Sequence, residues 1–233
     1  MKAMIRLVAV LLCSVVALPA VSAAGDAVLY AQLRQKLCTA THNVFECDRV
    51  VEAYQLQHGL GRYAARKGKS LTIQLKSKTV VLQDKEYADD VAADDVILYS
   101  YIDYLPSVGL HVIEIAYYEG TATLVIQHES GEKAYPSGFP VVSPDRQRFV
   151  ATSCDLEAEY DPNNIQVWGL QKGKLVREWS SGELEGWGPK GAQWLDANRA
   201  RVEKCCSGCT SENAVLCGTV DVVRQGGKWQ LIE

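Results

Sequence analysis

The feature that most constrains the fold is a series of short hydrophobic segments that begins after Gly59 and continues to the end of the chain. In each segment apolar residues recur at a period of two, and β-branched and aromatic residues dominate, which is typical of strands. Turn residues separate the segments, as between the strands of hairpins. The pattern predicts a mainly β fold built as an antiparallel β-meander. We expect strands over residues 63–65, 71–75, 79–82, 96–104, 110–118, 121–128, 193–195, 199–205, 214–223 and 229–232.

The block from residue 137 to residue 179 shows this organisation most clearly. Its first apolar residues lead into Ser143-Pro144-Asp145, where proline presets φ for a turn and its polar neighbours can bind the local backbone. A strand over residues 149–152 follows. After a long acidic loop, Ile165 and Val167 begin a new alternating segment. The block is predicted to be a strand, a turn, a strand, a loop and a two-strand hairpin.

This block resembles one blade of a WD-repeat β-propeller or of the related periplasmic propeller repeats. Where WD repeats carry Asp after the tryptophan, this chain has Gly169, and the loop from Asp155 to Asn164 is longer than usual. The chain also resembles a group of secreted bacterial proteins with no assigned activity, so the resemblance implies a fold and no reaction. The residues that carry it are Ser143, Pro144, Asp145, Phe149, Ile165, Val167, Trp168, Leu170 and Gly173.

The length of the chain limits how many such units it can hold. Propeller repeats of about 40 to 45 residues predict roughly four blades here. We therefore expect a short or incomplete β-propeller-like domain over residues 59–233, with a β-sandwich as the alternative. Residues 24–58 are expected to form a helical N-terminal segment, because Leu29, Leu33 and Leu37 recur at helical spacing. The spacing in residues 44–56 does not decide between helix and strand.

The N-terminus and the charge balance indicate where the protein works. Lys2 and Arg6 precede an apolar run and small residues up to Ala23, which predicts a signal peptide over residues 1–23 and a periplasmic or secreted protein. No second long apolar run follows, so no membrane association is expected in the mature form. The net charge of -4 argues against nucleic-acid binding. The basic cluster is interpreted as the solvated face of a hairpin; it comprises Arg62, Arg66, Lys67, Lys69, Lys76 and Lys78.

Of the eight cysteines, Cys13 lies in the expected signal peptide, which leaves an odd number, seven, in the mature chain. In an oxidising compartment most of them should pair. We expect a disulfide between Cys38 and Cys47. A hairpin loop centred on residue 211 places Cys205 opposite Cys217, which predicts a second disulfide and makes Cys154 the expected free thiol. The C-x-x-C sequence at Cys206-Ser207-Gly208-Cys209 precedes turn and strand residues rather than a helix, which argues against a redox centre.

The most suggestive candidate site is the acidic loop between residues 155 and 164. Its alternating oxygen ligands are of the kind that Ca²⁺ binds. Tyr160 and Gln166, however, occupy the places where a calcium loop has glycine and a bidentate glutamate. The solvated face of a long loop is the favoured interpretation, and we expect no cofactor. The loop contains Asp155, Glu157, Glu159, Asp161, Asn163 and Asn164.

Two functional hypotheses follow. The favoured one is an exported protein-binding or interaction module whose partner is a protein or a glycan. An inhibitor and an envelope-associated binding protein are the two roles considered for it. Its binding face would be built by the acidic loop and by residues 181–191, with Asp155, Glu157, Glu159, Asp161, Asn163 and Trp187 as the binding residues. The alternative is a secreted hydrolase-like enzyme that uses the Asp155–Asp161 loop and a histidine.

His111 and His128 are expected to be near cross-strand partners and, on balance, ordinary packed histidines. No nucleophile motif accompanies them.

Overall fold

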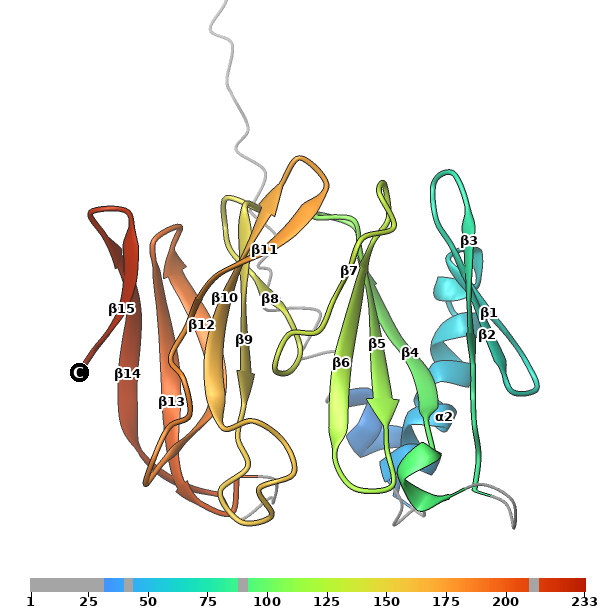
Figure 1. Cartoon of the computed structure of the whole chain (residues 1–233), viewed down its shortest axis with the longest axis horizontal. Coiled ribbons are helices and arrows are strands. Elements are labelled where there is room, and N and C mark those ends of the chain that lie inside the picture. Colours follow the sequence, from blue (N-terminus) through green and yellow to red (C-terminus); the bar gives the residue numbers. More distant parts are fainter. Residues whose placement is uncertain (1–31, 40–43, 88–91, 210–213) are drawn as a thin grey trace, which may run out of the picture.

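The computed structural model describes residues 32–39, 44–87, 92–209 and 214–233; the expected signal peptide lies outside the described residues. The described chain is mainly β and forms four antiparallel sheets (Figure 1). In every sheet each strand pairs with its neighbours in sequence, so the predicted antiparallel meander is confirmed. None of the helices in these ranges has the length and apolar character that a membrane crossing requires.

Each sheet takes a consecutive stretch of the chain. The first sheet contains β1 (Ala64–Lys67), β2 (Ser70–Gln74) and β3 (Thr79–Gln83). The second contains β4 (Leu98–Leu105), β5 (Leu110–Ala116), β6 (Thr121–Gln127) and β7 (Lys133–Ala134). The third contains β8 (Val141–Val142), β9 (Arg148–Ser153), β10 (Asn164–Gln171) and β11 (Lys174–Ser180). The fourth contains β12 (Gly188–Asp196), β13 (Arg199–Ser207), β14 (Val215–Gln225) and β15 (Lys228–Ile232). Every expected strand overlaps one of these strands.

The four sheets stack face to face in chain order (Figure 1), and each neighbouring pair shares a hydrophobic core. Leu71 and Ile73 of the first sheet pack with Ile113 of the second. Val150 of the third sheet packs with Val202 of the fourth. A strand whose two faces are both covered carries apolar residues on both of them. The second and third sheets each lie between two other sheets, so they are apolar on both sides. The resemblance to propeller repeats stays a prediction.

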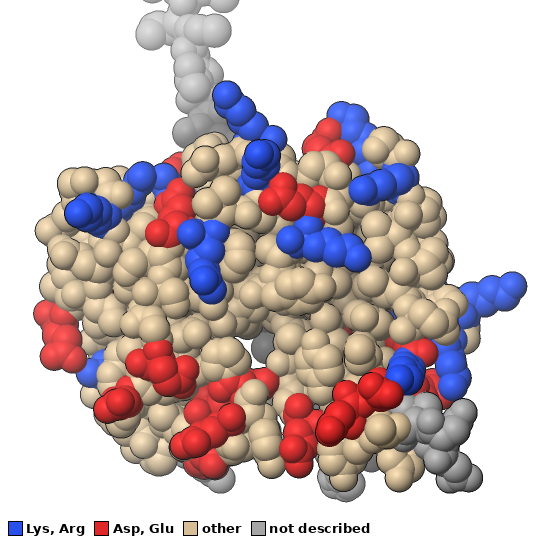
Figure 2. Space-filling model, in the orientation of Figure 1, with Lys and Arg blue, Asp and Glu red and all other residues tan. Residues whose placement is uncertain are grey.

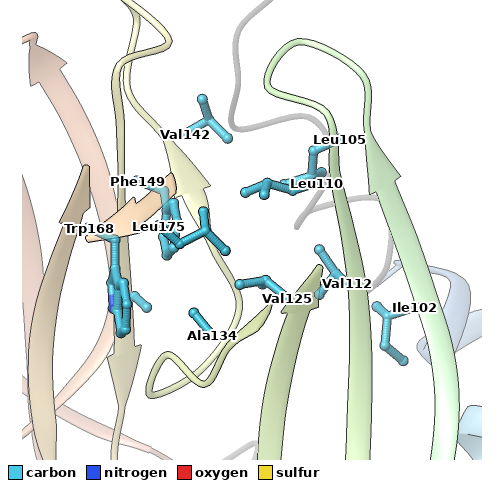
Figure 3. Close-up of a cluster of buried hydrophobic side chains, with 11 residues drawn as sticks. Ile102, Leu105, Leu110, Val112, Val125, Ala134, Val142, Phe149, Trp168 and Leu175 are labelled. Carbon is cyan, nitrogen blue, oxygen red and sulfur yellow. The ribbon is translucent and has the colours of Figure 1, made fainter. Parts of the chain in front are cut away.

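The block of residues 137–179 supplies the third-sheet side of the core between the second and third sheets. Figure 3 shows Leu110 and Val125 of the second sheet pointing toward Phe149 and Leu175 of the third. Trp168 is 9% exposed in this core, and its indole N–H donates to Gln166 Oε1 at 2.8 Å. The polar end of the indole is thus satisfied inside the protein. Trp168 thus contributes to the core of the protein.

The N-terminal segment contains a helix, α2 (Val44–Gln57), that packs against β4. Glu52 of α2 accepts hydrogen bonds from Arg66 Nε at 2.8 Å and from the backbone N–H of Tyr101 at 2.6 Å. Asp84 accepts from Arg66 at 3.1 Å and from the N–H of Tyr99 at 2.9 Å. The Arg66 side chain is only 15% exposed, so placing it on a solvated face was wrong. The two carboxylates satisfy backbone groups along the free edge of β4 and join the helix to two sheets.

Three disulfides occur among the described residues, and their pairing corrects part of the prediction. Cys38–Cys47 is confirmed. The expected Cys205–Cys217 bridge was wrong, because Cys217 pairs with Cys206 and Cys205 is free and buried. Irregularities in the β13–β14 register on both sides of Cys205 place it opposite Leu216 and turn its side chain into the core. Cys154, the expected free thiol, is bonded to Cys209, so the two ends of the C-x-x-C sequence belong to different bridges.

Candidate functional site

The two loops that were expected to form a binding face lie together and line one open depression of about 600 Å³. One is the acidic loop between β9 and β10, and the other connects β11 to β12. Among the expected residues, Asp155, Glu159, Asp161 and Asn163 line the depression, whereas Glu157 and Trp187 do not. The residues that complete the lining are Leu156, Tyr160, Pro162, Glu183, Leu184, Glu185 and Gly186. We call this feature the acidic depression.

Asp155 organises the acidic loop. Its carboxylate accepts backbone N–H groups from Ala158 and Tyr160, each at 2.9 Å, and from Asp161 at 3.0 Å. Burial works to raise the pKa of Asp155, but these donors outweigh it and hold the pKa below its ordinary value. Asp155 is therefore a structural acceptor at neutral pH, and it gives the loop a defined shape.

Other polar contacts attach this loop to its surroundings. Asp161 accepts from the N–H and the hydroxyl of Thr121 on β6, at 2.9 and 3.0 Å. Glu157 Oε1 accepts from the N–H of Gly208 after β13 at 3.0 Å. Asn163, which is 2% exposed, donates its amide N–H groups to the carbonyl oxygens of Leu184 and Trp187. The loop thus bridges three of the four sheets, and its two walls are held together by hydrogen bonds.

The carboxylates of the loop do not form a calcium cage. Asp155, Glu157 and Asp161 are engaged by backbone donors rather than directed at a common point. In the described part of the chain, three or more potential ligand atoms of His, Cys, Asp or Glu converge only at Cys154, Cys205 and Cys209. Calcium would need six to eight oxygen ligands at one centre. The polar loop face is the interpretation that the geometry supports.

Charged side chains are unevenly distributed over the face shown in Figure 2. Figure 2 shows acidic side chains gathered along the edge that carries the acidic depression and basic side chains mostly toward the opposite edge. The depression is lined by five carboxylates and by no Lys, Arg or His. Glu159, Glu183 and Glu185 are exposed there, and Tyr160 is 59% exposed. Such a surface attracts positively charged groups.

Trp187 contributes to structure more than to the depression. Its partly buried ring packs against the core between the third and fourth sheets, and the ammonium group of Lys204 lies 4.7 Å from the ring centroid. This contact is a cation–π interaction. The indole is therefore engaged in core packing and in this contact.

The two histidines are hydrogen-bonded to each other, as near cross-strand partners should be. His111 Nε2 lies 3.0 Å from His128 Nδ1, and His111 Nδ1 lies 2.8 Å from the hydroxyl oxygen of Tyr101. Burial, with a smaller contribution from His128, lowers the pKa of His111 to about 4. His111 pairs with Ile126, five residues along β6 from Thr121, which holds the acidic loop. That separation is roughly 17 Å at about 3.3 Å per residue, so acid and base do not converge as the hydrolase hypothesis requires.

One half-buried titratable group was missed at the sequence level. Glu114 on β5 is hydrogen-bonded to Asp48 of α2, whose side chain is 3% exposed and lies 3.6 Å from Arg34. Burial and the Asp48 carboxyl group raise the pKa of Glu114 to about 8, against the opposing effect of Arg34. Glu114 therefore keeps its proton at neutral pH. The available signal was a glutamate inside the apolar segment of residues 110–116.

No protein-family model matches this chain, and no curated protein matches its sequence. The candidate site is therefore defined by its own geometry: a depression with a fixed shape, an acidic lining and hydrogen-bonded walls.

Proposed function

We propose that this protein is an exported interaction module that binds a positively charged protein segment in the acidic depression. The observation that carries the proposal is that a loop within the third sheet and the loop that connects this sheet to the fourth line one depression whose charged groups are all carboxylates. Complementary charge guides a partner to such a surface and fixes its orientation. The four stacked sheets, taken as successive blades of an incomplete propeller, provide the rigid support for the loops.

The composition of the lining favours a basic peptide over a glycan. Tyr160 is the one aromatic residue among the lining residues, whereas glycan sites depend on stacking surfaces. Five carboxylates suit lysine and arginine side chains instead. The three disulfides support export, because such bridges persist in oxidising compartments.

The proposal is tested by removing charge from the lining without disturbing the loop. Glu159 and Glu185 are exposed, whereas Asp155 and Asp161 hold the backbone. The double substitution Glu159→Gln and Glu185→Gln should weaken binding of an oligolysine peptide. Surface ion pairs of about 0.2 to 1 kcal/mol each imply a loss of roughly 2- to 30-fold. Calorimetry or fluorescence titration at low salt measures the change.

A matched control has the same net charge as the Glu159→Gln and Glu185→Gln double variant. Asp94→Asn with Glu203→Gln removes two exposed carboxylates outside the lining. The control should bind the peptide like the natural protein, and it should recover the same partner from a periplasmic extract. Equal weakening by both double variants would show that only overall charge matters and would refute a specific site.

A further inference from the structure

Three cysteine sulfurs lie close together at the point where the acidic loop begins. Cys154 follows β9, Cys205 lies in β13, and Cys209 lies in the turn after β13. Their sulfur atoms all lie within 4.8 Å of one another. Cys154 and Cys209 form a disulfide, and Cys205, at 0% exposure, is free. A nucleophilic thiol is therefore buried directly beside a disulfide.

The local backbone allows this approach. Cys205 pairs with Gly188 in β12, and a Cβ added to Gly188 would overlap with the sulfur of Cys154. The missing side chain at this position leaves the space in which the bridge lies against β13. The Cys205 thiol donates to the carbonyl oxygen of Ser207 at 3.0 Å, which gives the proton a defined acceptor.

We propose that Cys154, Cys205 and Cys209 form an internal thiol–disulfide exchange site that can move the bridge at the base of the acidic loop. A local opening of the fold admits water to the buried Cys205, hydroxide takes its proton, and the thiolate attacks the sulfur of Cys209. A Cys205–Cys209 bond forms, the Cys154–Cys209 bond breaks, and Cys154 leaves as a thiolate that takes up a proton. Attack on Cys154 instead gives a Cys154–Cys205 bond and releases Cys209. One disulfide and one thiol remain in every case, so no external oxidant or reductant is needed.

Exchange alters how the acidic loop is attached. The Cys154–Cys209 bridge and the Glu157–Gly208 hydrogen bond both join the start of this loop to the turn after β13. The Cys205–Cys209 isomer keeps only the hydrogen bond, whereas Cys206–Cys217 stays in place in all three isomers. The chemistry concerns the sulfurs alone and does not depend on what the acidic depression binds.

The test follows the position of the free thiol in the intact, non-reduced chain. The protein is incubated at about pH 8.5, where an ordinary thiol is half ionised, and exchange is then stopped with acid. Denaturation in acid and labelling with a pyridyl disulfide, which reacts at low pH, are followed by peptide mass spectrometry. Exchange predicts one label in total among Cys154, Cys205 and Cys209, divided between Cys205 and at least one of the other two, at a rate independent of protein concentration.

The control variant is Cys205→Ser, which should carry no label at Cys154 or Cys209 after the same treatment. A label that stays on Cys205 alone in the natural chain, at every incubation time, would overturn the proposal. So would equal labelling of Cys154 in the Cys205→Ser variant, because the bridge would then be opening without the thiol. A rate that rises with protein concentration would show exchange between molecules and would also overturn it.

Discussion

Acidification should destabilise this protein through His111. The pKa of His111 is lowered from 6.5 to about 4 by burial, so the folded protein holds the neutral imidazole while the unfolded chain takes up a proton first. A depressed pKa contributes stability that is present above about pH 6.5 and is lost as the pH falls toward 4. The full pKa difference of about 2.5, at about 1.36 kcal/mol per unit, corresponds to about 3.4 kcal/mol. Between about pH 7 and pH 4.5 the expected loss is about 2.4 kcal/mol.

The assay compares urea denaturation of the natural protein with that of His111→Gln at both pH values. The substitution should be destabilising at neutral pH, because it removes the hydrogen bonds to Tyr101 and His128. That destabilisation should shrink by about 2 kcal/mol at about pH 4.5, since the variant has no imidazole to protonate. Contributions from Glu114 and other carboxyl groups are shared by both proteins and cancel in the difference.

A matched substitution checks that the effect belongs to the buried ring. His58 is exposed, and its side chain contacts only the carbonyl oxygen of Tyr54 and the ring of the same residue among the described contacts. His58→Gln is measured at the same two pH values. If the free-energy difference between His111→Gln and the natural protein is the same at both pH values, the assignment of the acid sensitivity to His111 is refuted.

The remaining predictions concern the carboxyl groups of Glu114 and Glu52. The pKa of Glu114 is raised to about 8, so its protonated form contributes stability that is present below about pH 4.5 and is lost as the pH rises through 8. Between pH values near 5 and 8, the melting temperature of Glu114→Gln should therefore change less than that of the natural protein. Equal changes in the two proteins would contradict this. Glu52→Ala should destabilise the fold by about 3 to 5 kcal/mol, because Arg66 and the Tyr101 N–H lose a buried partner. Glu86→Ala, which removes an exposed ion pair with Lys69, should cost less than about 1 kcal/mol in the same denaturation assay. Similar losses for both would mean that the Glu52 contacts are not strong.

Local alternation was sufficient to predict the strands. Apolar residues at a period of two place Ile165 and Val167 on one face of β10, and turn residues separate each segment from the next. The helix α2 was left undecided because its charged residues interrupt the apolar spacing; Asp48 and Glu52 are buried and serve as partners for other groups. Such pairs join residues far apart in the chain, which no local pattern reports.

Only part of the candidate site was predictable, because its residues come from segments that are separate in the sequence. Composition identified the acidic loop, but only the fold brings Glu183 and Glu185 beside it. The cysteine pairing failed because it depended on a regular hairpin register, and the irregularities beside Cys205 move its side chain into the core. A shift of one residue in a strand reverses the face of every side chain beyond it.

The carboxylates of Glu52 and Asp84 occupy the places where another strand would add to β4. The N–H groups of Tyr99 and Tyr101 are otherwise open donors at the margin of the second sheet. An unprotected margin of this kind invites edge-to-edge pairing between molecules. Glu52 from the helix and Asp84 from the segment after β3 thus cap this margin from two directions, and together they leave these two donors no free valence for a strand of another molecule.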